Sequence, residues 1–151
     1  MGLLSFLFGR KKAGSAVANL VRSHAPGGSV LSLGPAESWS EVPERSYGNW
    51  VAVDRSFKDR DVSKRVRTVR RSVDSYVPEQ SFSLVIFDNT DPDDLPDLLH
   101  RFESALAPGG AFIVSLPDSR HARKAWNTLG RRYRTLDEIE SSTSLTRLLS
   151  L

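Results

Sequence analysis

Apolar residues in this chain gather into short runs separated by polar or glycine-rich stretches. Five runs have the length and composition of buried β-strands: residues 29–33, 49–53, 66–69, 81–87 and 111–116. Residues 133–139 and 146–151 predict two weaker strands that form a C-terminal hairpin. Apolar residues at helical spacing predict helices at 14–24, 95–106 and 119–129, and a short helix at 37–42.

Residues typical of helix ends and turns lie between these runs, where the predicted helices and strands begin or end. Asp93 or Asp94 is placed to cap the second long helix, Pro96 suits its first turn, and Pro108-Gly109-Gly110 predicts its end. Strands that alternate with helices favour an α/β fold. We therefore expect a Rossmann-like three-layer sandwich, with a mostly parallel sheet that ends in an antiparallel hairpin. The polar stretch 55–65 lacks an apolar stripe that could form a covering helix.

Composition narrows the class of protein. A length of 151 residues predicts one domain, which we assign to residues 13–151. Cysteine is absent, so disulfides and thiolate chemistry are excluded and a cytoplasmic location is expected. No apolar run reaches the roughly 18 residues that a membrane-spanning helix needs. The net charge of +3 allows an anionic partner without requiring one.

Residues 1–12 form a distinct leader, an apolar stretch followed by Gly9-Arg10-Lys11-Lys12. Its basic cluster follows the apolar run instead of preceding it, which differs from a secretory signal. Two interpretations remain open. The leader packs on the domain or on another copy in a homo-oligomer, or it contacts a partner protein or a membrane surface, which would make the protein peripheral to the membrane.

Candidate ligand-binding residues follow from the fold class. Open parallel sheets bind ligands at the carboxyl ends of their strands, where the strand order reverses. The loops expected there contain Gly34, Pro35, Ala36, Asp54, Arg55, Val73, Asp74, Asp88 and Asn89. Asp54 lies 20 positions after Gly34, a spacing at which an acidic side chain accepts hydrogen bonds from ribose hydroxyls.

Four segments together resemble the class I S-adenosylmethionine-dependent methyltransferases. Val30 to Ser38 (VLSLGPAES) resembles the strand and glycine turn of the family's first motif, and Val51 to Asp54 resembles its second strand with the ribose-binding acid. Ser81 to Asp88 resembles the fourth strand. Leu98 to Pro117 resembles the following helix, Pro-Gly-Gly turn and fifth strand, which is the most specific match.

The resemblance implies S-adenosylmethionine as the cofactor and methyl transfer to an unknown acceptor, a small molecule or a protein. It places Gly34 against the methionine part of the cofactor, Asp54 on the ribose and Asp74 near the adenine. Asp88 and Asn89 would face the methyl group and the acceptor. Methyl transfer depends strongly on positioning, so a general base is optional and no catalytic residue is assigned.

The first motif departs from the family pattern at three positions: Ser32 replaces the expected acid, and Ala36 and Ser38 replace the second and third glycines. A second hypothesis is therefore a catalytically inactive methyltransferase-like domain that serves as a binding or assembly module. A third, a nicotinamide-binding Rossmann domain, is disfavoured because the glycine-rich turn that seats a pyrophosphate is missing.

The remaining polar residues favour no other chemistry. The three histidines, His24, His100 and His121, lack metal-ligand spacing, so no metal site is predicted. Basic residues cluster between Arg55 and Arg71, and Phe57 is the only aromatic residue within this cluster. Nucleic-acid binding by base stacking is therefore not supported. This cluster is interpreted as a solvated face.

Overall fold

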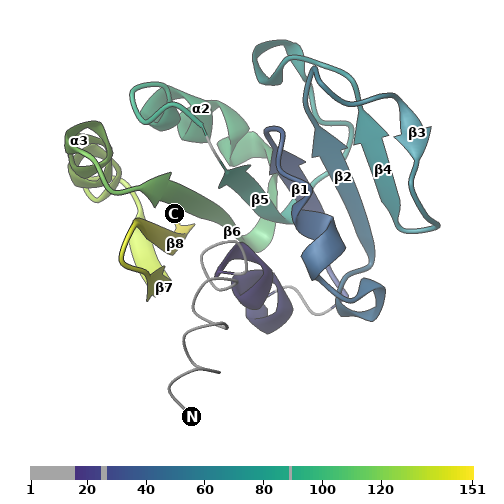
Figure 1. The fold of residues 1–151 in the computed structure, drawn as a ribbon, viewed down its shortest axis with the longest axis horizontal. Helices are drawn as coiled ribbons and strands as arrows, with labels where there is room; N and C mark the ends of the chain where they lie inside the picture. The colour runs from purple at the N-terminus through teal and green to yellow at the C-terminus, as the bar shows by residue number, and fades with distance from the viewer. Residues whose placement is uncertain (1–15, 25–26, 89) are drawn as a thin grey trace.

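A computed structural model describes residues 16–24, 27–88 and 90–151. The leader, the first three residues of the assigned domain and Asn89 lie outside these residues. The described residues form an eight-stranded sheet in the order β3-β4-β2-β1-β5-β6-β8-β7 (Figure 1). The long strands are β1 (Ser29–Leu33), β2 (Asn49–Val53), β4 (Val66–Val69), β5 (Phe82–Asp88), β6 (Leu106–Pro117), β7 (Arg134–Glu140) and β8 (Ser144–Ser150), with β3 (Arg60–Asp61) at one edge.

The central strands β4, β2, β1, β5 and β6 are parallel, whereas β8 runs antiparallel to both β6 and β7. The chain proceeds from β1 outward through β2 to β4, and then crosses back to place β5 on the other side of β1. This reversal creates a topological switch point between β1 and β5. The predicted α/β sandwich with a C-terminal antiparallel hairpin is confirmed.

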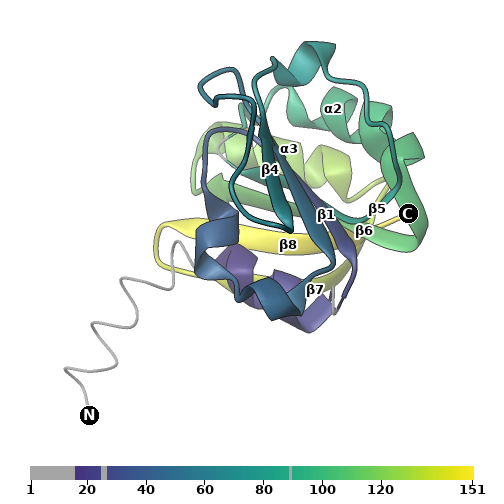
Figure 2. The ribbon, with the colours of Figure 1, turned by 90° about the vertical axis from the view of Figure 1, so that its right-hand side faces the viewer.

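Helices cover both faces of the sheet (Figures 1 and 2). On one face lie a helix over residues 16–24 and two one-turn 3₁₀ helices, η1 (Ser38–Glu41) and η2 (Glu44–Ser46). On the other face lie α2 (Leu95–Phe102) and α3 (Arg120–Leu129). The two hydrophobic cores match these layers. One holds Val21, Trp39 and Trp50, and the other holds Leu99 and Trp126.

The local sequence explains where α3 begins, but it explains the start of α2 less well. Ser119 caps α3, as its hydroxyl accepts a hydrogen bond from the Ala122 N–H at 3.0 Å. Asp94 occupies the cap position of α2, but its side chain makes no capping hydrogen bond there. Asp93, the other predicted cap, does not cap α2 either. Its own backbone N–H donates to the Asp91 carboxylate instead.

The predicted helix 95–106 is too long. α2 ends at Phe102, a 3₁₀ turn η4 (Glu103–Ala105) follows, and Leu106 already belongs to β6. Leu106 pairs with Phe82, but the next pair is Leu84 with Ala111, so residues 107–110 form an irregularity inside the strand. The Pro-Gly-Gly segment is therefore not the end of a helix: it lies within β6, where the register against β5 shifts.

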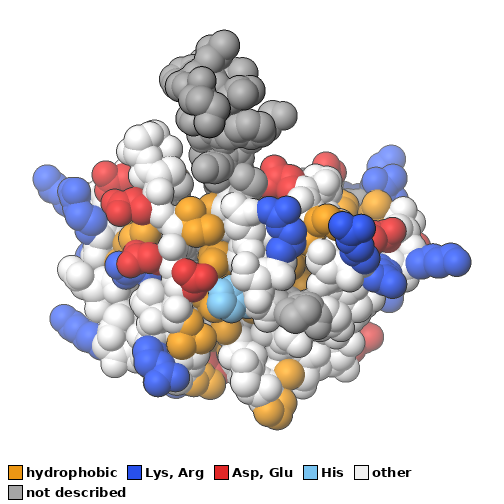
Figure 3. All heavy atoms as spheres, turned by 90° about the horizontal axis from the view of Figure 1, so that it is seen from below, with side chains coloured by type: hydrophobic (Ala, Val, Ile, Leu, Met, Phe, Trp, Pro, Cys, Tyr) orange, Lys and Arg blue, Asp and Glu red, His pale blue; other side chains and the backbone are white. Residues whose placement is uncertain are grey.

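The outer half of the sheet has little helical cover, as the polar stretch 55–65 predicts. Apart from β3, the described residues between β2 and β4 form turns and bends. Between β4 and β5, the described residues contain one helical element, the 3₁₀ turn η3 (Val73–Ser75). Figure 3 shows Lys and Arg side chains standing out at this end of the molecule. The eight basic residues of the cluster are all exposed: Arg55, Lys58, Arg60, Lys64, Arg65, Arg67, Arg70 and Arg71. Among the described helices, none is long and apolar enough to cross a bilayer.

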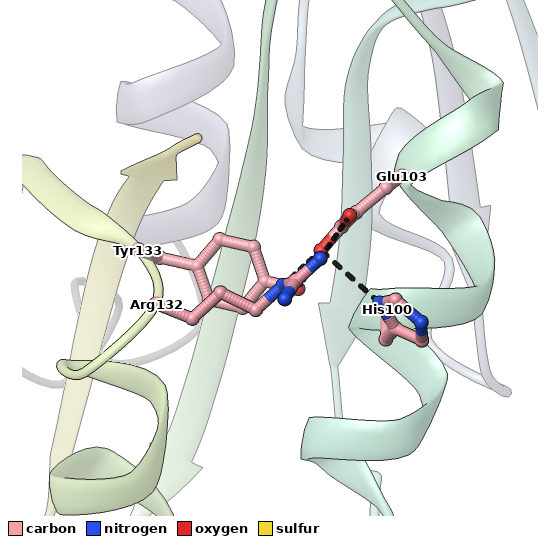
Figure 4. Close-up of polar contacts among 4 residues, drawn as sticks. All are labelled: His100, Glu103, Arg132 and Tyr133. Carbon is pink, nitrogen blue, oxygen red and sulfur yellow. Dashed lines mark hydrogen bonds and ion pairs between the residues drawn. The ribbon is translucent and has the colours of Figure 1, made fainter.

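Glu103 joins two segments at the far side of the core (Figure 4). Its carboxylate accepts hydrogen bonds from Arg132 at 2.6 and 2.7 Å and from the Tyr133 hydroxyl at 2.5 Å. His100 lies 3.6 Å from the same carboxylate. The hydrogen bond from Arg132 is the main cause that lowers the pKa of Glu103 to about 2, with a further contribution from Tyr133. This arrangement ties η4 to the segment that follows α3.

Replacing Glu103 by Gln is expected to lower the free energy of unfolding by about 1–3 kcal/mol, because charge-assisted hydrogen bonds are lost beside the buried Tyr133. A carboxyl whose pKa is depressed in the folded state stabilises the protein above its unfolded pKa. This contribution is lost as the pH falls from about 4.5 towards 2. Urea unfolding at pH 7 and pH 3 measures both effects.

Glu138→Gln is the matched control, because Glu138 is exposed and makes a single 3.5 Å contact with Arg147. The interpretation is wrong if both variants lose the same stability at pH 7, or if the difference between Glu103→Gln and the parent protein persists undiminished at pH 3.

Candidate functional site

The switch point is held together by a close approach between the ends of β1 and β5. Gly34 follows β1 with a φ angle of +123°, a conformation that favours glycine. A Cβ atom at this position would lie 2.6 Å from the backbone carbonyl oxygen of Asp88. The Gly34 N–H donates to the Val53 carbonyl at 3.0 Å, which links the turn to β2 as well. Gly34 is therefore required by the geometry of three adjacent strand ends.

A cavity of about 530 Å³ opens beside this turn. Its walls come from the segment after β1, the ends of β5 and β6, the turn between β7 and β8, and the helix 16–24. Of the predicted site residues, Ala36 and Asp88 line it. The volume lies within the range of about 300–1,000 Å³ that is typical of small-molecule sites. The carboxyl ends of the parallel strands thus carry a cavity of suitable size where the fold class predicts one.

Asp54 lies at the end of β2, outside the residues that line the cavity. Its carboxylate oxygen Oδ2 accepts hydrogen bonds from the Ser56 N–H at 2.9 Å and from the Ser56 hydroxyl at 2.5 Å. These contacts orient the half-buried side chain at the strand end and leave Oδ1 with no hydrogen bond from another described residue. Arg55, the next residue, is exposed.

The loop after β4 lies farther along the same sheet edge. Val73 and Asp74 belong to η3, which Ser72 caps by accepting from the Asp74 N–H. Arg101 of α2 donates to the carbonyls of Val73 and Tyr76 at 3.1 and 2.8 Å, which holds this loop against α2. Neither Val73 nor Asp74 lines the cavity. Pro35 is exposed beside Gly34, and Asn89 lies outside the described residues.

The cavity is acidic. Glu37, Glu41 and Asp88 line it, and its described lining residues include no Lys, Arg or His. Burial, with repulsion from Asp88 as a second cause, raises the pKa of Glu41. The described residues hold no cluster of His, Asp or Glu with the geometry of a metal site.

Sequence reasoning missed Glu41, Ser115, Thr143 and Ser144, which line the cavity together with Asp88. Ser115 lies on β6, and its hydroxyl contacts that of Thr146 on β8 at 2.8 Å. Thr143 and Ser144 reach the site because the β7–β8 turn returns to the carboxyl end of the parallel strands. The only available signal was the antiparallel hairpin itself, which does not reveal the position of its turn.

Ser32, which replaces the expected acid of the first strand, has a structural partner. Its hydroxyl accepts a hydrogen bond from the Trp50 indole N–H at 2.9 Å, inside the core that also contains Tyr47. Ser32 is 4% exposed and is not among the residues that line the cavity. The serine at this position therefore has a structural role, because it is the hydrogen-bond acceptor for a tryptophan on the neighbouring strand.

No protein-family profile matches the sequence, and no curated protein matches it either. Solved structures do match. The N-methyltransferase NodS from Bradyrhizobium japonicum WM9 is 11% identical with a TM-score of 0.71, over 93% of this chain and 95% of that one. A putative methyltransferase from Pseudomonas syringae is 20% identical with a TM-score of 0.65, over 96% and 99%.

A third match is the 1,6-didemethyltoxoflavin-N1-methyltransferase of Burkholderia thailandensis, in a structure with bound 1,6-didemethyltoxoflavin and S-adenosylhomocysteine. It is 18% identical with a TM-score of 0.70, over 91% of this chain and 77% of that one. These similarities establish that the chain has the class I methyltransferase fold, as the sequence motifs predicted. They concern the fold, because the identities are low.

Proposed function

We propose that this protein binds S-adenosylmethionine at the carboxyl ends of β1, β2 and β5 and transfers its methyl group to an acceptor bound in the adjoining cavity. The observation that carries the proposal is the Gly34 turn, pressed against the Asp88 carbonyl beside an acidic cavity of about 530 Å³. The fold shared with known methyltransferases supports the choice of cofactor.

The residues present fit this cofactor. Asp54 offers an oriented carboxylate with one oxygen available for ribose hydroxyls. The cavity carboxylates suit the positive charges of the sulfonium and the amino group. Two one-turn 3₁₀ helices, η1 and η2, follow the Gly34 loop where nucleotide-binding folds place a longer α-helix. The described residues form no α-helix at this point, which is compatible with a cofactor that has no phosphate to bind.

When bound, S-adenosylmethionine supplies an electrophilic methyl group on a sulfonium. The chain's own contribution is to hold the ribose through Asp54, to let the backbone approach at Gly34, and to position the acceptor against the cavity wall. Alignment of this kind supplies a large part of the acceleration in such displacements. A general base is therefore optional.

Asp54→Ala is expected to weaken S-adenosylhomocysteine binding by about tenfold to a hundredfold, because a charge-assisted hydrogen bond contributes about 1.5–3 kcal/mol. Titration calorimetry measures the affinity. Asp54→Asn separates two effects, since an amide oxygen still accepts from the Ser56 N–H and preserves the turn while the negative charge is lost.

Asp61→Asn is the control, because this exposed Asp lies on the edge strand β3. The parent protein should bind S-adenosylhomocysteine with micromolar affinity. Absence of binding at millimolar concentration would contradict the proposal, and so would equal affinity for the parent protein and Asp54→Ala.

A further inference from the structure

The outer end of the sheet concentrates positive charge. Residues 55–71 hold eight Lys and Arg against two Asp, a net charge of +6, whereas the rest of the chain holds 13 Lys and Arg against 16 Asp and Glu, a net charge of −3. We call these eight side chains the basic surface. All eight are exposed, and none forms an ion pair with a described acidic residue. Their charge is therefore balanced by solvent ions or by an anionic partner.

A groove of about 780 Å³ lies within this end of the molecule. Val51 on β2 and Arg67 on β4 line it and are register partners on neighbouring strands, so their side chains lie on the same face of the sheet. Val51 and Val69 pack at the margin of the core that contains Leu99 of α2. Figure 1 shows β3 and β4 at the end of the sheet away from α3. The groove is thus a part of the sheet face beyond the helical cover.

The walls of the groove are held in place by hydrogen bonds. On one side, the Arg70 N–H donates to the Asp59 carboxylate at 2.7 Å, which fastens the turn before β3 to the end of β4. On the other side lie residues 75–80, and Arg101 of α2 fixes them by donating to the Tyr76 carbonyl at 2.8 Å. The backbone that carries the charges is therefore ordered before a partner binds, which reduces the entropy lost on binding.

The groove offers hydrogen-bond donors that suit phosphate oxygens. Three guanidinium groups and one phenol line it: Arg67, Arg70, Arg71 and Tyr76. Guanidinium groups bind phosphate with two parallel hydrogen bonds, and a phenol hydroxyl can donate a further one. Asp59 and Glu79 also line the groove, but the Asp59 carboxylate already accepts the hydrogen bond from the Arg70 N–H. The lining retains an excess of positive charge.

A nucleic acid fits this surface better than a membrane does. A phosphodiester chain presents one anionic group at each nucleotide, which matches cations spread along β3, β4 and the adjoining loops. Peripheral membrane binding uses a flat contact with apolar or aromatic anchors, whereas this surface surrounds a groove, and residues 55–80 expose no aromatic side chain. The scarcity of aromatic residues argues against base stacking, but contact with phosphates requires none.

We infer that this protein binds the phosphate backbone of a nucleic acid across the basic surface, with phosphates seated in the groove by Arg67, Arg70 and Arg71. The contact reads no base sequence. It lies beside the candidate site, because the Asp54 N–H donates to the Val69 carbonyl at 3.2 Å. The inference goes beyond the proposed function and does not depend on binding of S-adenosylmethionine.

Fluorescence anisotropy of the full chain with a labelled RNA duplex, and with a DNA duplex of the same arbitrary sequence, tests the inference. Four to six phosphate contacts predict a slope of log affinity against log salt of about −3.6 to −5.4, a loss of about 10²–10³-fold between 50 and 200 mM KCl. The combined variant Arg67→Gln, Arg70→Gln and Arg71→Gln should reduce the slope by about 3 and weaken binding at least about tenfold at low salt.

The matched control is Arg120→Gln, Arg131→Gln and Arg134→Gln, which removes the same charge from exposed arginines on α3, after it and on β7. It should keep the salt slope of the parent protein. Glu79→Gln removes a negative charge from the groove and should strengthen duplex binding by about twofold to fivefold. Urea unfolding verifies that each variant is folded.

Several results would overturn the inference: no duplex binding at low salt, equal effects of the two triple variants, or no gain from Glu79→Gln. Polyglutamate and vesicles of phosphatidylcholine with phosphatidylserine, supplied at equal anionic charge, separate the possible partners. If either displaces the duplex as well as unlabelled duplex does, the surface is not a nucleic-acid site. Titration with S-adenosylhomocysteine is measured separately, so a failure here leaves the proposed function standing.

Discussion

Gly34→Ala is expected to lower the free energy of unfolding by about 2–6 kcal/mol, the sum of a backbone in a disfavoured conformation and an overpacked contact. The added methyl group would meet the Asp88 carbonyl oxygen at 2.6 Å. That oxygen belongs to the backbone of β5 and cannot rotate away. Either β1 and β5 separate or the turn changes its φ angle of +123°.

Urea unfolding measures this loss, and titration with S-adenosylhomocysteine measures its consequence at the site. Natural domains have a stability of about 5–15 kcal/mol, so the variant should remain folded in part but bind the ligand poorly. Because the same turn borders the cavity, a shift of the strand ends also displaces Ala36 and Asp88.

Gly109→Ala is the control, because Gly109 also has a positive φ angle, +77°, but a Cβ atom there would meet nothing within 4 Å. It isolates the conformational cost, about 1–2 kcal/mol. If Gly34→Ala costs no more than Gly109→Ala, the close approach of β1 and β5 does not explain the glycine.

Trp50→Ala is expected to lower the free energy of unfolding by about 3–5 kcal/mol, as for other large aromatic side chains removed from cores. Trp50 is fully buried, and its ring packs edge-on against Tyr47 with centroids 5.1 Å apart. Its indole N–H is the donor to the Ser32 hydroxyl. The melting temperature should fall by about 6–20 °C, at about 2–4 °C per kcal/mol for a chain of this size.

Trp50→Phe divides this effect into packing and hydrogen bonding. It keeps an aromatic ring but removes the donor, and should cost about 1–3 kcal/mol. Adding Ser32→Ala should recover part of that loss, because no hydroxyl is then left without its partner. A loss below about 1 kcal/mol for Trp50→Ala would contradict the assigned packing.

The sequence correctly predicted the elements that are marked by local signals, such as an apolar run, a capping residue or a polar turn. Strands 49–53 and 66–69 were predicted with the boundaries that the structure has, because apolar runs bounded by polar or glycine-rich stretches leave few alternatives. Ser119 was predicted to begin a helix, and its capping hydroxyl lies one residue before α3. The C-terminal hairpin was predicted because both of its strands are short and separated by a polar turn.

Predictions failed where the outcome depended on pairing between distant segments. Leu106 continues a helical stripe in the sequence, yet it joins β6 because Phe82 of β5 offers it a pairing partner. The Pro-Gly-Gly turn has the composition of a helix stop. No local signal indicates that four residues can be accommodated within a strand while the ladder resumes at Ala111.

The candidate site shows the same division. Gly34, Ala36, Asp54 and Asp88 were selected because parallel strands place their carboxyl ends along one edge, a rule that needs only the order of the elements. The roles of these residues in binding stay predictions. Glu41 and Ser144 were not selected, since their segments look like ordinary turns and reach the cavity only when η1 and the β7–β8 turn fold over the strand ends.

The sequence by itself determined that this chain forms an α/β sandwich with a methyltransferase-like order of motifs, because hydrophobic periodicity and turn residues act over short distances. Only the tertiary structure decided three features. The Asp88 carbonyl leaves no space for a Cβ atom at residue 34, Ser32 accepts a hydrogen bond from the Trp50 indole, and three carboxylates line one cavity. These features depend on distances between segments far apart in the chain, which are set by how the strands pair and how the layers pack.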